Sequence, residues 1–90
     1  MLSPNYPNPF NPSTTIEFTL PLNKLISLRI YDMTGREVRS LIAPAEYPAG
    51  KHAAIWDGKD NAGQAVASGQ YIYRLEFGGF MKSRVMTLVK

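Results

Sequence analysis

The side chains that could carry out acid–base, nucleophilic or metal chemistry are few in this chain of 90 residues. It has one histidine, His52, no cysteine and seven carboxylates. Catalysis needs a nucleophile, or a paired acid and base, held together in a cleft. Neither neighbour of His52 is acidic. We therefore expect His52 to be an exposed strand residue, and we expect the chain not to be an enzyme.

The densest group of oxygen donors is Asp57, Asp60 and Asn61, in the stretch DGKDNAG. A calcium-binding loop of the EF-hand type follows the pattern D-x-[DN]-x-[DN]-G, and the spacing here differs from it. Asp and Asn side chains also hydrogen-bond to their own backbone in tight turns. Such turns explain these residues at least as well as calcium does. The sequence therefore predicts no metal and no cofactor, with calcium as the weaker alternative.

Three aromatic residues raise the possibility of sugar binding. Tyr71 and Tyr73 lie two positions apart, on one face of a predicted strand, and Trp56 has a ring that can stack on a sugar. Small β-sandwiches, however, use Trp and Tyr in their cores, where each ring buries roughly 150–250 Å². We favour a core role for all three. A carbohydrate-binding or surface-binding accessory module of a secreted enzyme remains the alternative.

The charge of the chain gives little reason to expect a nucleic-acid partner. The net charge is +3, and the Lys and Arg residues are spread along the chain, with mild crowding at Lys82, Arg84 and Lys90. Nucleic-acid-binding domains concentrate such charge on one face. No apolar run approaches the roughly 18 residues of a membrane span. The N-terminus does not resemble a signal peptide, so an export signal would lie elsewhere in a longer protein.

Short segments of alternating apolar and polar residues position these side chains. The segments are 14–20, 25–32, 37–42, 51–58, 71–77 and 81–89. Turn residues separate them, including Gly35 and the pair Gly78-Gly79, and residues 43–51 are predicted to be a loop. Within them we expect Val38 and Ala54 to face inward. Such strands, at spacings of roughly 8–12 residues and without helical periodicity, predict an all-β antiparallel sandwich of about seven strands.

Residues 1–12 differ from the rest, because they contain four prolines and three asparagines. Each proline biases the preceding residue away from the helical region. We therefore predict a semi-rigid, polyproline-like linker over 1–12 and a sandwich domain over 13–90. Tyr6 and Phe10 are unusual in a plain linker. We expect at least Phe10 to fold back as a lid over one end of the core.

Four sequence blocks follow one another along nearly the whole chain: NYPNPFNPSTTIEFTLP, LRIYDMTGREVRSL, AGKHAAIWDGKDNAGQAVASGQYIYRLE and RVMTLVK. In order and spacing they resemble the C-terminal sorting domain of the type IX secretion system, a family of Bacteroidetes and related bacteria. The blocks around YD-x-x-G and WDG also resemble the immunoglobulin-like domain of flagellar hook-capping proteins. The resemblance implies an immunoglobulin-like β-sandwich.

The resemblance also implies a function. Sorting domains follow a cargo domain in the same chain and act as its address. After export to the periplasm they are recognised by an outer-membrane translocon, and in many members a sorting peptidase then removes them, so that the cargo is secreted or held at the cell surface. The hook-capping likeness instead implies a structural spacer or assembly domain.

In the sorting family, recognition is associated mainly with the C-terminal strand. Carried to this chain, that strand supplies Lys82, Arg84, Met86, Leu88 and Lys90. A terminal strand with an open edge can be recognised by addition of a further strand. The same edge could pair two copies of the chain into a homodimer.

Overall fold

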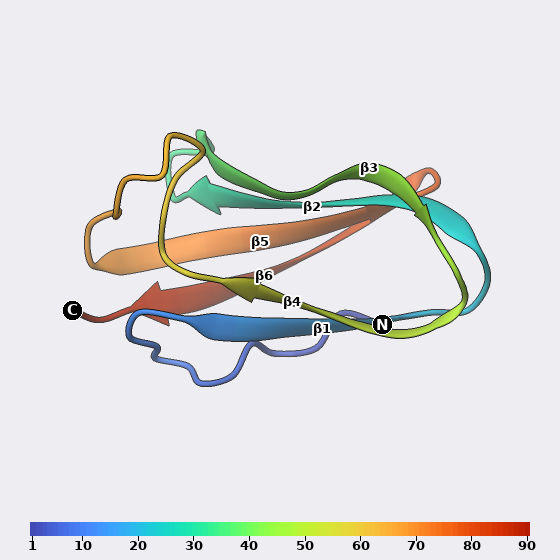
Figure 1. The fold of residues 1–90 in the computed structure, drawn as a ribbon, viewed down its shortest axis with the longest axis horizontal. Helices are drawn as coiled ribbons and strands as arrows, with labels where there is room; N and C mark the ends of the chain where they lie inside the picture. The colour runs from blue at the N-terminus through green and yellow to red at the C-terminus, as the bar shows by residue number, and fades with distance from the viewer.

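The computed structural model describes all 90 residues and contains six strands and no helix (Figure 1). The strands are β1 (Thr14–Leu20), β2 (Lys24–Asp32), β3 (Glu37–Tyr47), β4 (Gly50–Trp56), β5 (Gly69–Phe77) and β6 (Phe80–Leu88). The all-β prediction is confirmed, although about seven strands were expected. Instead of a further strand, residues of the N-terminal segment form isolated bridges with β1. No helix is present that could span a membrane.

The strands form two antiparallel sheets that face each other (Figure 1). The smaller sheet pairs β1 with β4, and the larger has the order β3-β2-β5-β6. This arrangement leaves β6 at one edge of the larger sheet and β3 at the other. Phe77 pairs with Phe80 across the two-residue turn Gly78-Gly79, as the sequence predicts.

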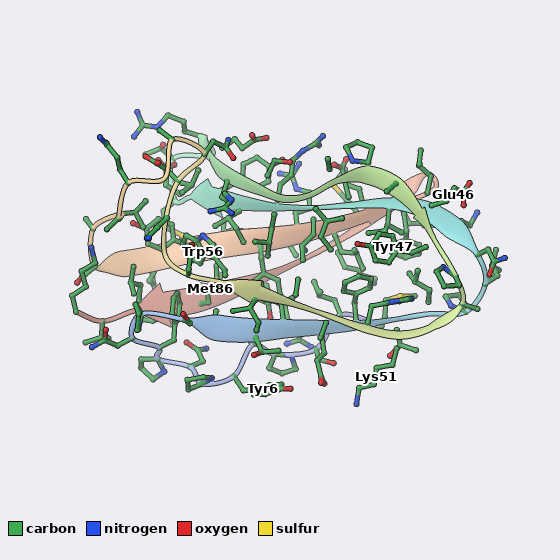
Figure 2. All side chains as sticks on the ribbon, in the orientation of Figure 1. Tyr6, Glu46, Tyr47, Lys51, Trp56 and Met86 are labelled. Atoms are coloured by element: carbon green, nitrogen blue, oxygen red, sulfur yellow. The ribbon has the colours of Figure 1, made fainter.

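The core lies between the two sheets and is built by the predicted alternation. On β1 the buried apolar residues are Ile16, Phe18 and Leu20; on β5 they are Tyr71, Tyr73, Leu75 and Phe77. Trp56 and Met86 also lie between the sheets (Figure 2). Val38 and Ala54 are partly buried and pack against this cluster. Each sheet therefore presents one apolar face inward, as binary patterning requires.

Strand β3 corrects the loop predicted over 43–51, because it continues through Pro44 to Tyr47. Proline cannot donate to a sheet, but an edge strand tolerates it. The pairing of β2 with β3 also shifts register at three points, and each shift leaves an extra residue on β3. Bulges and proline are features that discourage pairing with further strands. The β3 edge is therefore poorly suited to adding another strand.

Candidate functional site

Residues 1–12, which we call the head, pack against the sandwich, whereas the sequence predicts a semi-rigid spacer there. Figure 1 shows the head running beside β1. Tyr6 and Thr15 exchange backbone hydrogen bonds of 3.0 and 2.9 Å, and the Ser3 amide donates to the Glu17 carbonyl at 2.9 Å. Backbone groups that a tether would leave to water are thus paired with β1.

The head then crosses from β1 to β6. The Phe10 amide donates to the Thr87 carbonyl, and the Val89 amide donates to the Phe10 carbonyl, both at 3.0 Å. Phe10 is 2% exposed, and its ring centroid lies 5.7 Å from that of Trp56. The expected burial of Phe10 is confirmed. Tyr6 remains about half exposed, and its hydroxyl donates to Glu17 at 2.8 Å.

Two further hydrogen bonds hold the start of the head to the larger sheet. The Tyr73 hydroxyl donates to the Ser3 carbonyl at 2.7 Å, and Arg84 Nε donates to the Leu2 carbonyl at 2.8 Å. Burial raises the pKa of Tyr73 above its ordinary value. The head therefore covers the side of the sandwich between β1 and β6.

Strand β6 has an unpaired edge between the Gly78-Gly79 turn and the point where the head meets Thr87. Thr87 directs both its amide and its carbonyl away from β5, toward Asn8 Oδ1 and Phe10. The β5–β6 register is continuous, so the amides and carbonyls of Met81, Ser83 and Val85 point the same way. These outward amides and carbonyls have no hydrogen-bond partner, either in the backbone or in a side chain of the domain. We call residues 81–85 the open edge.

The structure places the five predicted recognition residues in different surroundings. Lys82 and Arg84 are exposed and line an open depression of about 360 Å³ with Met1, Leu2 and Ser83. Met86 and Leu88 lie on the same face of β6 but are each 1% exposed. A protein that binds the folded domain would therefore not reach these two side chains.

Lys90 lies beyond the end of β6, apart from the open edge. It is exposed, and its amide donates to Ser68 Oγ at 3.1 Å. Of the five predicted residues, only Lys82 and Arg84 therefore lie side by side on an exposed surface.

Trp56, Tyr71 and Tyr73 lie in the core, so their rings offer no platform for a sugar. Trp56 and Tyr73 are fully buried and Tyr71 is 7% exposed. Trp56 and Tyr71 pack edge to face with their centroids 5.4 Å apart. The Trp56 Nε1–H donates to the Lys59 carbonyl at 2.9 Å, which satisfies the indole in its buried position.

His52 is half-buried, which corrects the expectation of an exposed histidine. Its ring lies 5.4 Å from that of Phe18 and 5.1 Å from that of Tyr47, between centroids. Nε2 is 2.7 Å from the Pro48 carbonyl. The reason is that His52 shares the inward face of β4 with Ala54 and Trp56.

The residues considered for calcium form turns in the loop after β4. Asp60 Oδ1 accepts the amides of Ala62 and Gln64, and Asp57 Oδ1 accepts the Lys59 amide, at 2.9–3.1 Å. Asn61 Oδ1 accepts the Ser40 amide at 2.8 Å. No group of three or more His, Asp or Glu side chains in the chain is placed to hold a metal ion. These oxygens organise the loop and tie it to β3.

Two comparisons with known proteins fit this geometry. The model of the FlgD Ig-like domain matches residues 10–77. Among solved structures, dimeric latent PorU from Porphyromonas gingivalis is 24% identical with a TM-score of 0.77, over 98% of this chain and 9% of that one. PorZ, described as an essential surface component of the type IX secretion system of the same bacterium, is 22% identical with a TM-score of 0.65, over 99% and 11%.

The chain therefore spans about a tenth of the length of each of these two proteins. Because both proteins are less than 25% identical to this chain, the similarity shows a shared fold only. That fold is shared along almost the whole of this chain. No curated protein matches the sequence. The family model covers most of the sandwich, from the buried Phe10 to the end of β5. The chain belongs to the FlgD Ig-like domain family.

Proposed function

We propose that this domain is a non-catalytic sorting module that directs an attached cargo protein across the outer membrane through a type IX secretion system. The observation that carries the proposal is the open edge of β6, which lies in the strand that sorting domains use for recognition. Strand addition at this edge gives affinity through backbone hydrogen bonds and selectivity through alternate side chains.

The four sequence blocks and the fold support the secretion role. The domain fold recurs within PorZ, a surface component of this secretion system. Cargo upstream in the same chain would be delivered to the cell surface or the exterior. The partners in this proposal are the outer-membrane translocon and a sorting peptidase.

A reporter assay tests the proposal. Residues 1–90 are fused behind a signal peptide and a reporter, and expressed in a bacterium that has the system and in a strain that lacks the translocon. Reporter at the surface or in the medium of the first strain, and periplasmic reporter in the second, is the expected result. Equal delivery with and without the domain, or in both strains, would contradict the sorting role.

The variants for this assay must leave the fold intact. Deleting residues 84–90 would remove Met86 and Leu88 from the core, so a loss of delivery would report unfolding. Ser83 is a better target, because it is exposed and its amide lies on the open edge.

A structural assembly domain is the second candidate, because the matching family model is that of the FlgD domain. The position of the domain in its parent protein distinguishes a sorting module from an assembly domain. A sorting domain lies at the extreme C-terminus of a protein with a signal peptide, whereas an assembly domain is under no such constraint.

A further inference from the structure

We propose that the open edge of β6 binds an extended partner strand that carries acidic side chains at alternating positions. The inference deepens the proposed function and rests on it for the choice of edge. The acidic character of the partner strand is inferred from the side chains that border the edge.

Two basic residues on the open edge are not neutralised within the domain. Lys82 and Arg84 lie on one face of β6, two positions apart, and neither belongs to an ion pair. The only hydrogen bond of the Arg84 side chain goes from Nε to the Leu2 carbonyl. Both cationic groups are therefore available to a ligand in the depression that they line with Met1 and Leu2.

The opposite face of the same edge is apolar. Met81 is 58% exposed and Val85 is 49% exposed, with Ser83 between them. In an antiparallel pair, side chains directly opposite each other lie on the same face and interact. The matching strand therefore has carboxylates opposite Lys82 and Arg84, and apolar residues opposite Met81 and Val85.

The same charges disfavour a second copy of this chain as the occupant. Antiparallel pairing centred on Ser83 places Lys82 opposite Arg84 of the second copy. Pairing centred on Lys82 or on Arg84 places that one residue opposite its own copy in the second chain. Like charges directly opposite destabilise a pair of strands. An acidic strand avoids this repulsion and replaces it with attraction.

The length of the site is also defined. The Gly78-Gly79 turn bounds one end, and at the other end Asn8 and Phe10 already occupy the edge at Thr87. At about 3.4 Å per residue, a strand of about seven residues fills the interval. A longer partner must displace the head.

Two capped heptapeptides test the inference. One has the sequence Thr-Val-Glu-Thr-Glu-Val-Thr, which places its valines opposite Met81 and Val85, and the other has lysine in place of both glutamates. Each is titrated into the 90-residue domain, and the amide resonances are followed by NMR. The acidic peptide is expected to shift the resonances of the Met81, Ser83 and Val85 amides and to protect these amides from exchange. It should also bind at least tenfold more tightly than the lysine peptide. Its affinity should fall with added salt, because the attraction is screened.

Two sets of variants give the controls. Lys82→Glu combined with Arg84→Glu should reverse the preference between the two peptides. Ser83→Pro should abolish binding of both, because it removes an outward amide that takes no part in pairing with β5. Ser83→Ala keeps that amide and should bind as the unaltered domain does. Well-dispersed spectra show that each variant is folded.

Equal binding of the two peptides, or amide shifts confined to regions outside the open edge, would overturn the inference. The proposed function fails separately. If the acidic peptide binds but Ser83→Pro still delivers a reporter, the inference stands and the sorting role of the edge does not. If Ser83→Pro stops delivery but neither peptide binds, the inference falls and the sorting role stands.

Discussion

Phe10 shows at the residue scale how the head becomes part of the fold. Its ring is buried against Trp56, and its backbone bonds to Thr87 and Val89 of the C-terminal segment. One residue thus joins the first and the last segments of the chain. Its position between prolines conceals this role, because local backbone preferences there indicate only an extended segment.

Replacing Phe10 with alanine should lower the free energy of unfolding by about 2–4 kcal/mol, through lost burial and the cavity that remains. Phe80 is a matched control, because it is 68% exposed, and Phe80→Ala should cost less than about 1 kcal/mol. Urea denaturation of the two variants gives the comparison. A cost below about 0.5 kcal/mol for Phe10→Ala would mean that the head is a plain tether.

Tyr73 makes the stability of the fold depend on pH in the alkaline range. Burial raises its pKa, so below pH about 10 its contribution to stability is fully present. The contribution is lost as the pH rises through the folded-state pKa, because only the unfolded chain ionises the phenol readily. Burial also raises the pKa of Tyr71, which acts in the same direction.

Tyr73→Phe should therefore reduce the loss of stability between about pH 8 and about pH 11. At the lower pH the variant should be less stable by about 1 kcal/mol, because the hydrogen bond to the Ser3 carbonyl is lost. Urea titrations at the two pH values measure both effects. An unchanged difference between the two pH values would show that Tyr73 does not contribute to this dependence.

At the scale of elements, the strands that the sequence predicts well are those buried on one face. Residues 71–77 alternate without interruption, and β5 is central in its sheet. Strand β3 was predicted too short, because the rule that proline ends a strand does not hold at a bulged edge. The burial of His52 was also missed, since it depends on which face of β4 turns toward Tyr47.

The contact between the head and the loop after β4 can be tested with two glycines. Gly58 and Gly63 have φ of 76° and 83°, so alanine at either costs about 1–2 kcal/mol in backbone strain. A Cβ on Gly58 would lie 3.0 Å from the Pro12 carbonyl, whereas one on Gly63 meets nothing within 4 Å. Gly58→Ala should therefore be the more destabilising in thermal melts. Equal costs would show that the loop and the head do not constrain each other.

At the scale of the whole molecule, the head closes one side of a sandwich whose smaller sheet has only two strands. It pairs with β1 and ends against β6, so it protects edges of both sheets. The sandwich architecture could be predicted from alternation and turn residues. The partners of the head could not, because contacts between residues about 80 positions apart leave no periodic signal in one sequence.

Removing residues 1–12 should therefore destabilise the domain and cause it to self-associate through the uncovered edges. Analytical ultracentrifugation over a range of concentrations measures this, with the complete 90-residue chain as the control. We expect the complete chain to remain monomeric. A truncated domain that is equally stable and monomeric would show that the head does not protect the edges.

Surface delivery of a reporter by the Ser83→Pro and Ser83→Ala domains tests the sorting role of the open edge most directly. Both substitutions remove the same exposed hydroxyl, but only proline removes the outward amide. Delivery by Ser83→Ala at the level of the unaltered domain, together with loss of delivery by a folded Ser83→Pro domain, is the predicted result. Equal delivery by the two variants would contradict recognition of the domain through β6.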